Sequence, residues 1–522
     1  MKKLLMLSFL LFTALINQAV AQVRTITGKV TDATSNQPLP GVTVLAKGTT
    51  VGTATGADGQ YTINVPEGSN ALVFRFIGYK SLEQAIGTRS VINAGLQLDN
   101  QQLEEVVVTA LGFKEDKDKI GSATSQVSGA KVAQSGETSA VTGLSGKASG
   151  VQITRSSGDP GAGAYIQIRG QSTITSSVQP LIIIDGVPVS NSTLGSGVGG
   201  VVQQSRLNDI NPNDIASVQI LKGASAAALW GSRAANGVMI ITTKRGSSGK
   251  GKINIGYDVT YSIDKISYTH DLQDTYGQGF GGVYSPTSAY SYGDKVANRA
   301  GGADAVDKSG QKFVAQDGTE YYPITQRNDR STYLDENFDA VFQDGHFLEQ
   351  NLSFSGGDQD GNFYASVSDL NQEGIIRNNS DYRRTTARIN AEKRLAPTFK
   401  ASGNVTYSKI GSNRIQQGSN TSGLYLGYLR NAPDFDIRDY KGTYFNAAGD
   451  AFLNRQRSYR RYLGNTASPI YNNPLWTINE QRNTSDVNRF IGAFELNYEP
   501  LTWLNFIARA GADHYTDQRL TF

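Results

Sequence analysis

The sequence contains no cysteine, and its charges almost cancel. Without cysteine the chain can form neither a disulfide nor a thiolate metal site, which suits an exported protein that relies on sheet closure for stability. Its 522 residues include 49 Lys and Arg residues and 46 Asp and Glu residues. A net charge this small gives no reason to expect a nucleic-acid partner or attraction to an anionic membrane surface.

Signals of catalysis and of metal binding are missing as well. The three histidines, His270, His346 and His514, are scattered along the chain, and no metal-ligand spacing occurs. No nucleophile elbow, P-loop or dinucleotide fingerprint is present. We therefore expect no metal, no other cofactor and no enzymatic activity.

Long apolar runs are confined to the start of the chain. Two lysines, the apolar run Leu4–Ile16 and the small residues Ala19–Ala21 together predict a signal peptide over residues 1–21. A transmembrane anchor is the alternative, but the run is too short to span a bilayer as a helix. No later segment reaches about 18 apolar residues, so a mature chain that crosses a membrane must do so as a β-barrel.

Residues 23–99 have the pattern of a small β-sandwich, because short alternating runs are separated by Gly, Pro and Asp turn signals. The clearest runs are Thr25–Val30, Val42–Ala46, Tyr61–Val65 and Leu72–Phe76. Four stretches of this segment resemble a carboxypeptidase-regulatory-like domain: Ile26–Asp32, Pro40–Val44, Thr55–Tyr61 and Phe76–Tyr79. The resemblance implies a binding or spacer module without catalysis.

Residues 103–119 join a β-prone stretch to a charged one. The three valines Val106–Val108 favour extended backbone, whereas Lys114–Lys119 is highly charged and has little to bury. Such a segment is a good candidate for adding a strand to the sheet edge of another protein. The alternative is that the valines form the last strand of the preceding sandwich.

Residues 120–246 contain an ordered series of motifs. They are Leu144–Ile153, Ser157–Ala162, Ile166–Gln171, Pro180–Val189, Ile210–Ile215, Leu221–Gly231, Ser232–Gly237 and Ile240–Lys244. In this order they resemble the plug domain of the SusC/RagA family of TonB-dependent transporters. An ordinary soluble α/β domain is the alternative, but it does not explain the segment that follows.

The residues of this block also predict local structure. The apolar run Leu181–Ile184 predicts a strand buried on both faces, and Asp185 with Gly186 predicts a tight hairpin turn. The stretch Ala224–Leu229 predicts a short helix, which Gly231 can end.

Residues 252–522 have the alternation of transmembrane β-strands. In Lys252–Asp264 isoleucine, tyrosine and valine occupy one face and polar residues or glycine the other, over more than the roughly 9–11 residues that a tilted strand needs. Weaker candidates are Phe347–Ser355, Asn362–Leu370, Tyr382–Lys393, Phe399–Ile410, Val487–Tyr498 and Trp503–Tyr515. The apolar face should meet lipid and the polar face the lumen.

The connections between these strands alternate between longer and shorter. This parity is typical of outer-membrane barrels, which have long extracellular loops and short periplasmic turns, and it predicts that the first strand runs outward. About seven strands cannot close an antiparallel barrel, so we expect a fragment or a truncated product. The predicted fold is mostly β: a small β-sandwich, a mixed α+β plug domain, and the first strands of an incomplete transmembrane β-barrel.

The resemblance also implies functional residues. It places a TonB box at Glu105, Val106, Val107, Val108, Thr109 and Ala110. It makes Arg169 a candidate latch between plug and barrel, with carboxylates expected on the barrel. The remaining residues of the plug motif are Gly170, Asp185, Gly186, Lys222, Gly231, Arg233, Asn236 and Gly237.

By the same resemblance, the function is TonB-dependent import of a bulky nutrient, an oligosaccharide or a peptide, across the outer membrane of a Gram-negative bacterium. The implied partners are TonB with ExbB and ExbD, a SusD-like surface lipoprotein, the nutrient and outer-membrane lipid. A siderophore or vitamin receptor and a non-transporting surface protein are the alternatives. Six tyrosines of the long connections can stack on ligands, but interfacial or loop packing is favoured: Tyr284, Tyr290, Tyr292, Tyr459, Tyr462 and Tyr471.

Overall fold

The computed structural model describes residues 24–33, 35–66, 68–76, 78–97, 106–108, 114–116, 124–170, 179–191, 199–222, 230–246, 251–464 and 471–522. The chain divides into two compact units, Met1–Val107 and Val108–Phe522. Within the described residues, no helix is long and apolar enough to span a bilayer.

The first unit is a two-sheet sandwich. One sheet has the order β4-β1-β7 and the other β3-β2-β5-β6. The strands are β1 (Arg24–Asp32), β2 (Thr43–Ala46), β3 (Gly52–Ala54), β4 (Gln60–Val65), β5 (Ala71–Arg75), β6 (Leu82–Ala85) and β7 (Ala94–Leu96). Four of them overlap the predicted runs. The sequence pattern did not identify β3, β6 and β7, which are three or four residues long.

The valines before the charged segment form a strand outside the two sandwich sheets. Strand β8 (Val106–Val108) pairs with β9 (Lys114–Asp116) in a two-stranded sheet of their own. Of the predicted TonB box, Glu105, Thr109 and Ala110 lie outside the described residues.

Residues 124–243, called the inner domain, contain a five-stranded mixed sheet of order β10-β15-β16-β13-β14 and a separate hairpin, β11-β12. The strands are β10 (Thr124–Ser128), β11 (Val151–Arg155), β12 (Ala164–Ile168), β13 (Leu181–Ile184), β14 (Val187–Val189), β15 (Ile215–Leu221) and β16 (Val238–Thr243). The helical segments are α2 (Gly129–Ala133) and the 3₁₀ turns η2 (Thr142–Leu144), η3 (Arg206–Asp209), η4 (Pro212–Asp214) and η5 (Gly231–Ala234).

Strand β13 is buried on both faces, as predicted. Ile182 and Ile184 pack into the main cluster of the inner domain, whereas Ile183 packs into a second cluster on the other side. The predicted hairpin turn is confirmed, because Asp185 (φ 47°) and Gly186 (φ 86°) take the left-handed conformation that a two-residue turn of this kind requires. The predicted helix at 224–229 lies outside the described residues.

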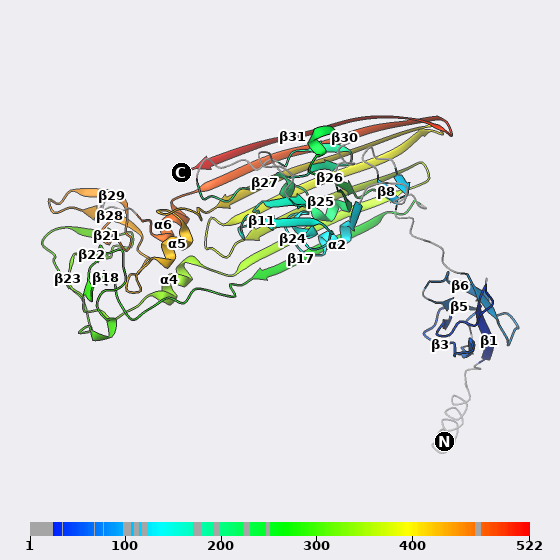
Figure 1. The fold of residues 1–522 in the computed structure, drawn as a ribbon, viewed down its shortest axis with the longest axis horizontal. Coiled ribbons are helices and arrows are strands. Elements are labelled where there is room, and N and C mark those ends of the chain that lie inside the picture. The colour runs from blue at the N-terminus through cyan, green and yellow to red at the C-terminus, as the bar shows by residue number, and fades with distance from the viewer. Residues whose placement is uncertain are drawn as a thin grey trace, which may run out of the picture. The chain divides into compact units, whose positions relative to one another are not determined.

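Seven antiparallel strands form one long curved sheet of order β17-β24-β25-β26-β27-β30-β31 (Figure 1). They are β17 (Asn254–Asp264), β24 (Gly345–Gly357), β25 (Gly361–Glu373), β26 (Asp381–Ala396), β27 (Phe399–Arg414), β30 (Asn483–Leu501) and β31 (Leu504–Thr521). Each contains most of one predicted strand. In the described part of the chain the sheet is open, with β17 and β31 as its edges.

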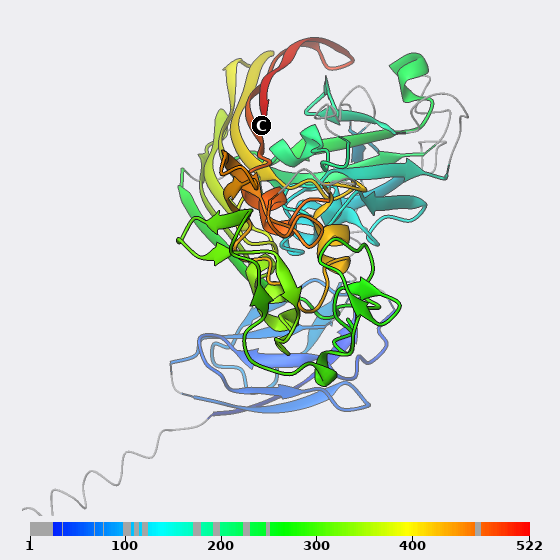
Figure 2. The same cartoon turned by 90° about the vertical axis from the view of Figure 1, so that its left-hand side faces the viewer.

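The two faces of the curved sheet have the polarity expected of a transmembrane barrel. Apolar side chains of β17 point outward, and Ile255, Tyr257 and Val259 are 58–69% exposed. The opposite face of the sheet is buried and polar, as at Glu349 and Asn351. The inner domain lies on this concave face (Figure 2), so the polar side chains have protein partners.

The long connections, residues 265–344 and 415–482, lie at one end of the curved sheet, and the tight turns lie at the other (Figure 1). The long connections form the end lobe, whose sheets are β18-β19, β20-β23 and β22-β21-β28-β29. Its strands are β18 (Gly279–Phe280), β19 (Val283–Tyr284), β20 (Ala305–Val306), β21 (Lys312–Ala315), β22 (Glu320–Tyr321), β23 (Ile324–Gln326), β28 (Lys441–Phe445) and β29 (Ala451–Gln456). Its helices are η6 (Val296–Asn298), α4 (Leu334–Val341), α5 (Leu424–Leu429) and α6 (Pro474–Asn479).

Candidate functional site

Three arginines of the curved sheet reach into the inner domain. Arg384 and Arg388 lie four residues apart on β26, so their side chains point to the same face, and Arg489 lies on β30. Each side chain is 3% exposed or less. A buried cation is costly unless it is paired and hydrogen-bonded, and each arginine has such partners.

Arg384 binds both the sheet and the inner domain. Through Nη2 it donates to Glu349 on β24 at 2.7 Å. Through Nη1 it donates to three inner-domain carbonyl oxygens, those of Thr138 (2.8 Å), Asn208 (2.7 Å) and Ile210 (3.1 Å). One side chain therefore joins two strands of the curved sheet to two separate segments of the inner domain.

Arg388 binds the hairpin turn of the inner domain. Its Nη2 lies 2.7 Å from Asp185 Oδ2, and both side chains are almost fully buried. Asp185 also accepts hydrogen bonds from the backbone N–H (3.0 Å) and the hydroxyl (2.6 Å) of Thr243. At the adjacent Gly186 a Cβ would lie 2.4 Å from Nη1 of Arg509, so the flexible end of that arginine would have to move. Asp185 and Gly186 of the predicted plug motif thus lie at the interface with the curved sheet.

Arg489 binds a third part of the inner domain. It donates to both carboxylate oxygens of Asp513 on β31 at 2.8 Å, and to the carbonyl oxygens of Arg206 and Ser190. Its Nη1 lies 3.3 Å from Asp209, which is also 3.5 Å from Arg206. Burial raises the pKa of Asp209 to about 6, although the two arginines act in the opposite direction.

The motif Ile210–Ile215 supplies a second set of contacts with the curved sheet. Three of its side chains are bonded to strand residues: Asn211 to Asn351 (3.1 Å), Asn213 to Glu349 (3.1 Å), and Asp214 to Tyr364 (3.0 Å) and Ser366 (2.6 Å). The sequence indicated this motif by its resemblance but assigned it no contact. Its amide and carboxylate groups bind strands β24 and β25.

Sequence reasoning did not identify Arg384, Arg388 and Arg489. It expected an arginine on the inner domain and carboxylates on the barrel, whereas these three contacts have the arginine on the sheet. A usable signal was present, because the predicted strand Tyr382–Lys393 has two arginines at alternate, inward-facing positions.

The predicted latch, Arg169, follows β12 with a φ of 61° and is exposed. Among the described residues, no carboxylate lies within ion-pair distance of it, and its latch role stays a prediction. Lys222 is buried and donates to the hydroxyls of Ser125 and Ser149. Burial lowers the pKa of Lys222, and the charge of Arg169 lowers it further.

The other residues of the plug motif are spread over the inner domain. Gly170 (φ 92°) is exposed, and Gly231 (φ 66°) and the exposed Arg233 belong to η5. The Nδ2 of Asn236 lies 3.4 Å from the carbonyl oxygen of Gln179. Gly237 (φ 91°) precedes β16, so these residues do not form one site.

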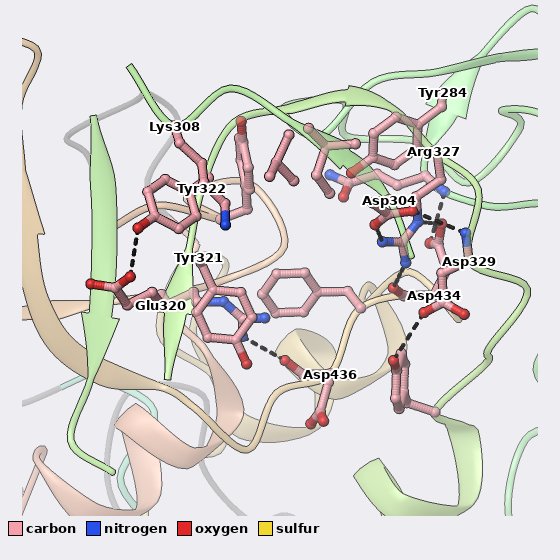
Figure 3. A pocket seen from close by; sticks show the side chains of 17 residues that line it. Tyr284, Asp304, Lys308, Glu320, Tyr321, Tyr322, Arg327, Asp329, Asp434 and Asp436 are labelled. Carbon is pink, nitrogen blue, oxygen red and sulfur yellow. Dashed lines mark hydrogen bonds and ion pairs between the residues drawn. The ribbon is translucent and has the colours of Figure 1, made fainter. Parts of the chain in front are cut away.

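The end lobe contains a cavity of about 510 Å³ (Figure 3). Tyrosine rings line it together with charged side chains, most of which are bonded within the chain. Arg327 pairs with Asp304, and Glu320 accepts a hydrogen bond from Tyr322 at 2.5 Å. Since these groups satisfy one another, the side chains around the cavity are held in place.

The six tyrosines of the long connections have different surroundings. Tyr284 and Tyr462 line this cavity. Tyr459 is buried and stacks on Tyr471 with ring centroids 6.2 Å apart, so this pair belongs to the packing of the lobe. Tyr290 and Tyr292 are 56% and 64% exposed.

Comparison with domain families gives two matches. The CarboxypepD_reg-like domain matches residues 26–108, and the TonB-dependent Receptor Plug Domain matches residues 116–238. The second match covers most of the inner domain.

Two relatives align over most of this chain. TonB-dependent receptor P26 of Formosa agariphila is 31% identical over 472 residues, which cover 90% of this chain and 41% of that protein. TonB-dependent receptor SusC of Bacteroides thetaiotaomicron is 30% identical over 506 residues, which cover 95% of this chain and 45% of that protein. The chain therefore spans less than half the length of these relatives, which are receptors and not enzymes.

A solved structure has the same fold. The RagAB peptide importer in its closed-closed state superposes with a TM-score of 0.57 at 23% identity, over 77% of this chain and 42% of that one. The domain matches, the relatives and this fold together show that the chain is related to the TonB-dependent receptors of the SusC/RagA type, which are outer-membrane proteins of Gram-negative bacteria.

Proposed function

We propose that the protein to which this chain belongs imports a bulky nutrient, an oligosaccharide or a peptide, across the outer membrane in a TonB-dependent manner. The inner domain acts as the plug, and its displacement opens the path. Two similar proteins support this proposal: RagAB is a peptide importer, and SusC is a TonB-dependent receptor.

The observation that carries this proposal is the polar interface between the inner domain and the curved sheet. Arginines, carboxylates, amides and carbonyl groups make the described contacts. The main apolar cluster of the inner domain includes one buried residue of the sheet, Ile491. A domain with its own apolar core and a polar contact surface can leave the sheet without exposing a large apolar area to water.

The energy for this displacement is proposed to come from TonB, with ExbB and ExbD, acting on the segment around Val106–Val108. TonB would add a strand to these valines, and main-chain hydrogen bonds would supply much of the affinity. The apolar outer face of β17 is proposed to contact outer-membrane lipid. A SusD-like surface lipoprotein is proposed to bind at the end lobe and to deliver the nutrient.

The test is uptake by cells that express the receptor with Val107→Pro. Proline removes one backbone donor from the added strand, so energised uptake of labelled oligosaccharides or peptides should be lost. The matched control is Val107→Thr, which keeps the donor and β propensity and should transport normally. Normal uptake by the proline variant contradicts the proposal, and uptake of ferric chelates alone would favour a siderophore receptor.

A further inference from the structure

A second cavity lies where the inner domain meets the end lobe. Its volume is about 370 Å³. The inner domain contributes Ser157, Gly158, Asp159 and Pro160, which belong to the tip of the β11-β12 hairpin. The other side is largely aromatic and aliphatic, and its rings include Tyr268, Phe342, Tyr425 and Tyr428.

The hairpin tip is held firmly in this position. The backbone N–H of Ser156 donates to the carbonyl oxygen of Gly163 at 2.9 Å, and that of Ala162 donates to the carbonyl oxygen of Asp159 at 3.0 Å. Gly161 has a φ of 66°, and a Cβ at this position would lie 2.2 Å from the ring of Tyr382 on β26. The tip therefore presents Asp159 to the cavity from a fixed backbone.

Asp159 is the one charged residue among the described residues that line the cavity. Its Oδ1 accepts a hydrogen bond from Gln417 Nε2 at 3.1 Å, whereas Oδ2 is buried without a hydrogen-bond partner. Burial raises the pKa of Asp159, although hydrogen bonds with Ser157 and Gln417 act in the opposite direction. A carboxylate oxygen with no donor in largely apolar surroundings is destabilised, so a donor or cation brought by a ligand would stabilise it.

The aromatic side of the cavity suits the remainder of such a ligand. Phe342 packs edge-on against Tyr428 with ring centroids 5.3 Å apart, and Tyr425 stacks on Tyr428 at 6.3 Å. Tyr268 is 76% exposed, so its ring is accessible to a ligand. Aromatic faces attract cations and cover apolar stems.

We propose that this cavity binds a protonated primary amine carried on an apolar stem, with Asp159 accepting hydrogen bonds from the ammonium group and the aromatic cluster covering the stem. This assignment rests on the proposed function and adds to it a chemical feature of the nutrient. A sugar hydroxyl could donate a hydrogen bond but would leave the carboxylate charge uncompensated, so the chemistry favours an amine. A ligand bound in this cavity contacts both the inner domain, which has to move during import, and the end lobe, which does not.

The test is calorimetric titration of the full-length receptor to which this chain belongs, purified in detergent micelles, with four probes. Nα-acetyl-lysine amide presents a side-chain amine and leucine amide a free N-terminus, so these two distinguish the possible sources of the ammonium group. Nα-acetyl-leucine amide is the neutral analogue, and maltotriose represents sugars. We expect at least one amine probe to bind at least tenfold more tightly than both neutral probes.

The variants separate recognition from folding. Asp159→Asn should weaken binding of the amine probe at least tenfold, and Tyr268→Ser should weaken it severalfold. The matched control is Glu137→Gln, a partly exposed inner-domain carboxylate paired with Arg155 outside this cavity, which should bind like the unchanged protein. Unchanged heat-modified migration on gels checks that each variant is folded.

Equal binding of amine and neutral probes, full affinity in a folded Asp159→Asn variant, or no binding of either amine would overturn the assignment. Energised uptake that persists in such a case would leave the transport function standing. Normal uptake by the Val107→Pro variant alongside tight amine binding would instead refute the transport mechanism and leave the site intact.

Discussion

Replacing Arg384 by methionine should release the inner domain from the curved sheet. Methionine keeps the apolar stem but removes the hydrogen bonds to three inner-domain carbonyl oxygens and to Glu349. Glu349 would stay buried with Asn213 as its remaining described partner. The bonds from Arg384 Nη1 are the ones that cross the interface. At roughly 1.5–3 kcal/mol for each hydrogen bond from a charged group, losing the two hydrogens of Nη1 as donors costs about 3–5 kcal/mol. At about 1.4 kcal/mol per factor of ten, opening of this interface should become roughly a hundred to several thousand times more frequent.

Amide hydrogen exchange in detergent measures this opening directly. Peptides that cover residues 205–215 should exchange faster by that factor, because their carbonyl groups lose Arg384. Arg383→Met is the matched control, since Arg383 is the adjacent residue of β26 and points to the opposite, exposed face. If Arg384→Met changes exchange no more than this control does, the buried arginine does not hold the domain. Combining it with Glu349→Gln should cost less than the sum of the two single changes, because they share one interaction.

Two further predictions concern the same interface. Gly186→Ala places a Cβ at a φ of 86° and close to the flexible end of Arg509. The β13-β14 hairpin should therefore be destabilised by about 1 kcal/mol, which amide exchange would show as a roughly fivefold faster rate in this hairpin. Unchanged exchange would mean that the turn tolerates a side chain. Asp209 should titrate near pH 6 rather than near 4. The folded state then binds the proton more tightly than the unfolded state does. Docking of the inner domain on the curved sheet is therefore most stable below about pH 4 and weakens as the pH rises to about 6. Infrared difference spectra against Asp209→Asn measure the titration, and a midpoint near 4 would show that the arginines outweigh burial.

The strands of the curved sheet could be predicted because their pattern is local. Alternation with period two, together with the parity of the connections, gave all seven in order. The strands of the end lobe could not be found in this way. They are two to six residues long, and β21 pairs with β28, which lies more than 120 residues further along the chain. An alternating pattern over so few residues carries too little signal to predict a strand, and the sequence does not indicate which strand pairs with which.

The candidate site was predictable only in part. Asp185 and Gly186 were found by resemblance and by turn chemistry, and the structure adds the arginine that they face. The contacts of Arg384 join residues 176 positions apart, so no local rule indicates them. The TonB box and the latch role of Arg169 stay predictions. The sequence does indicate that two arginines lie on the inward face of one strand. A charge buried there requires partners.

Because β21 pairs with β28, the two long connections form a single structural unit. One leaves the sheet after β17 and the other after β27, yet each supplies strands to the same four-stranded sheet of the end lobe. Grafting one connection from a relative would leave the other with an unpaired strand edge, which is prone to aggregation. New ligand specificity would therefore be moved between such receptors by exchanging both segments together, and natural variation in one should be accompanied by matching variation in the other.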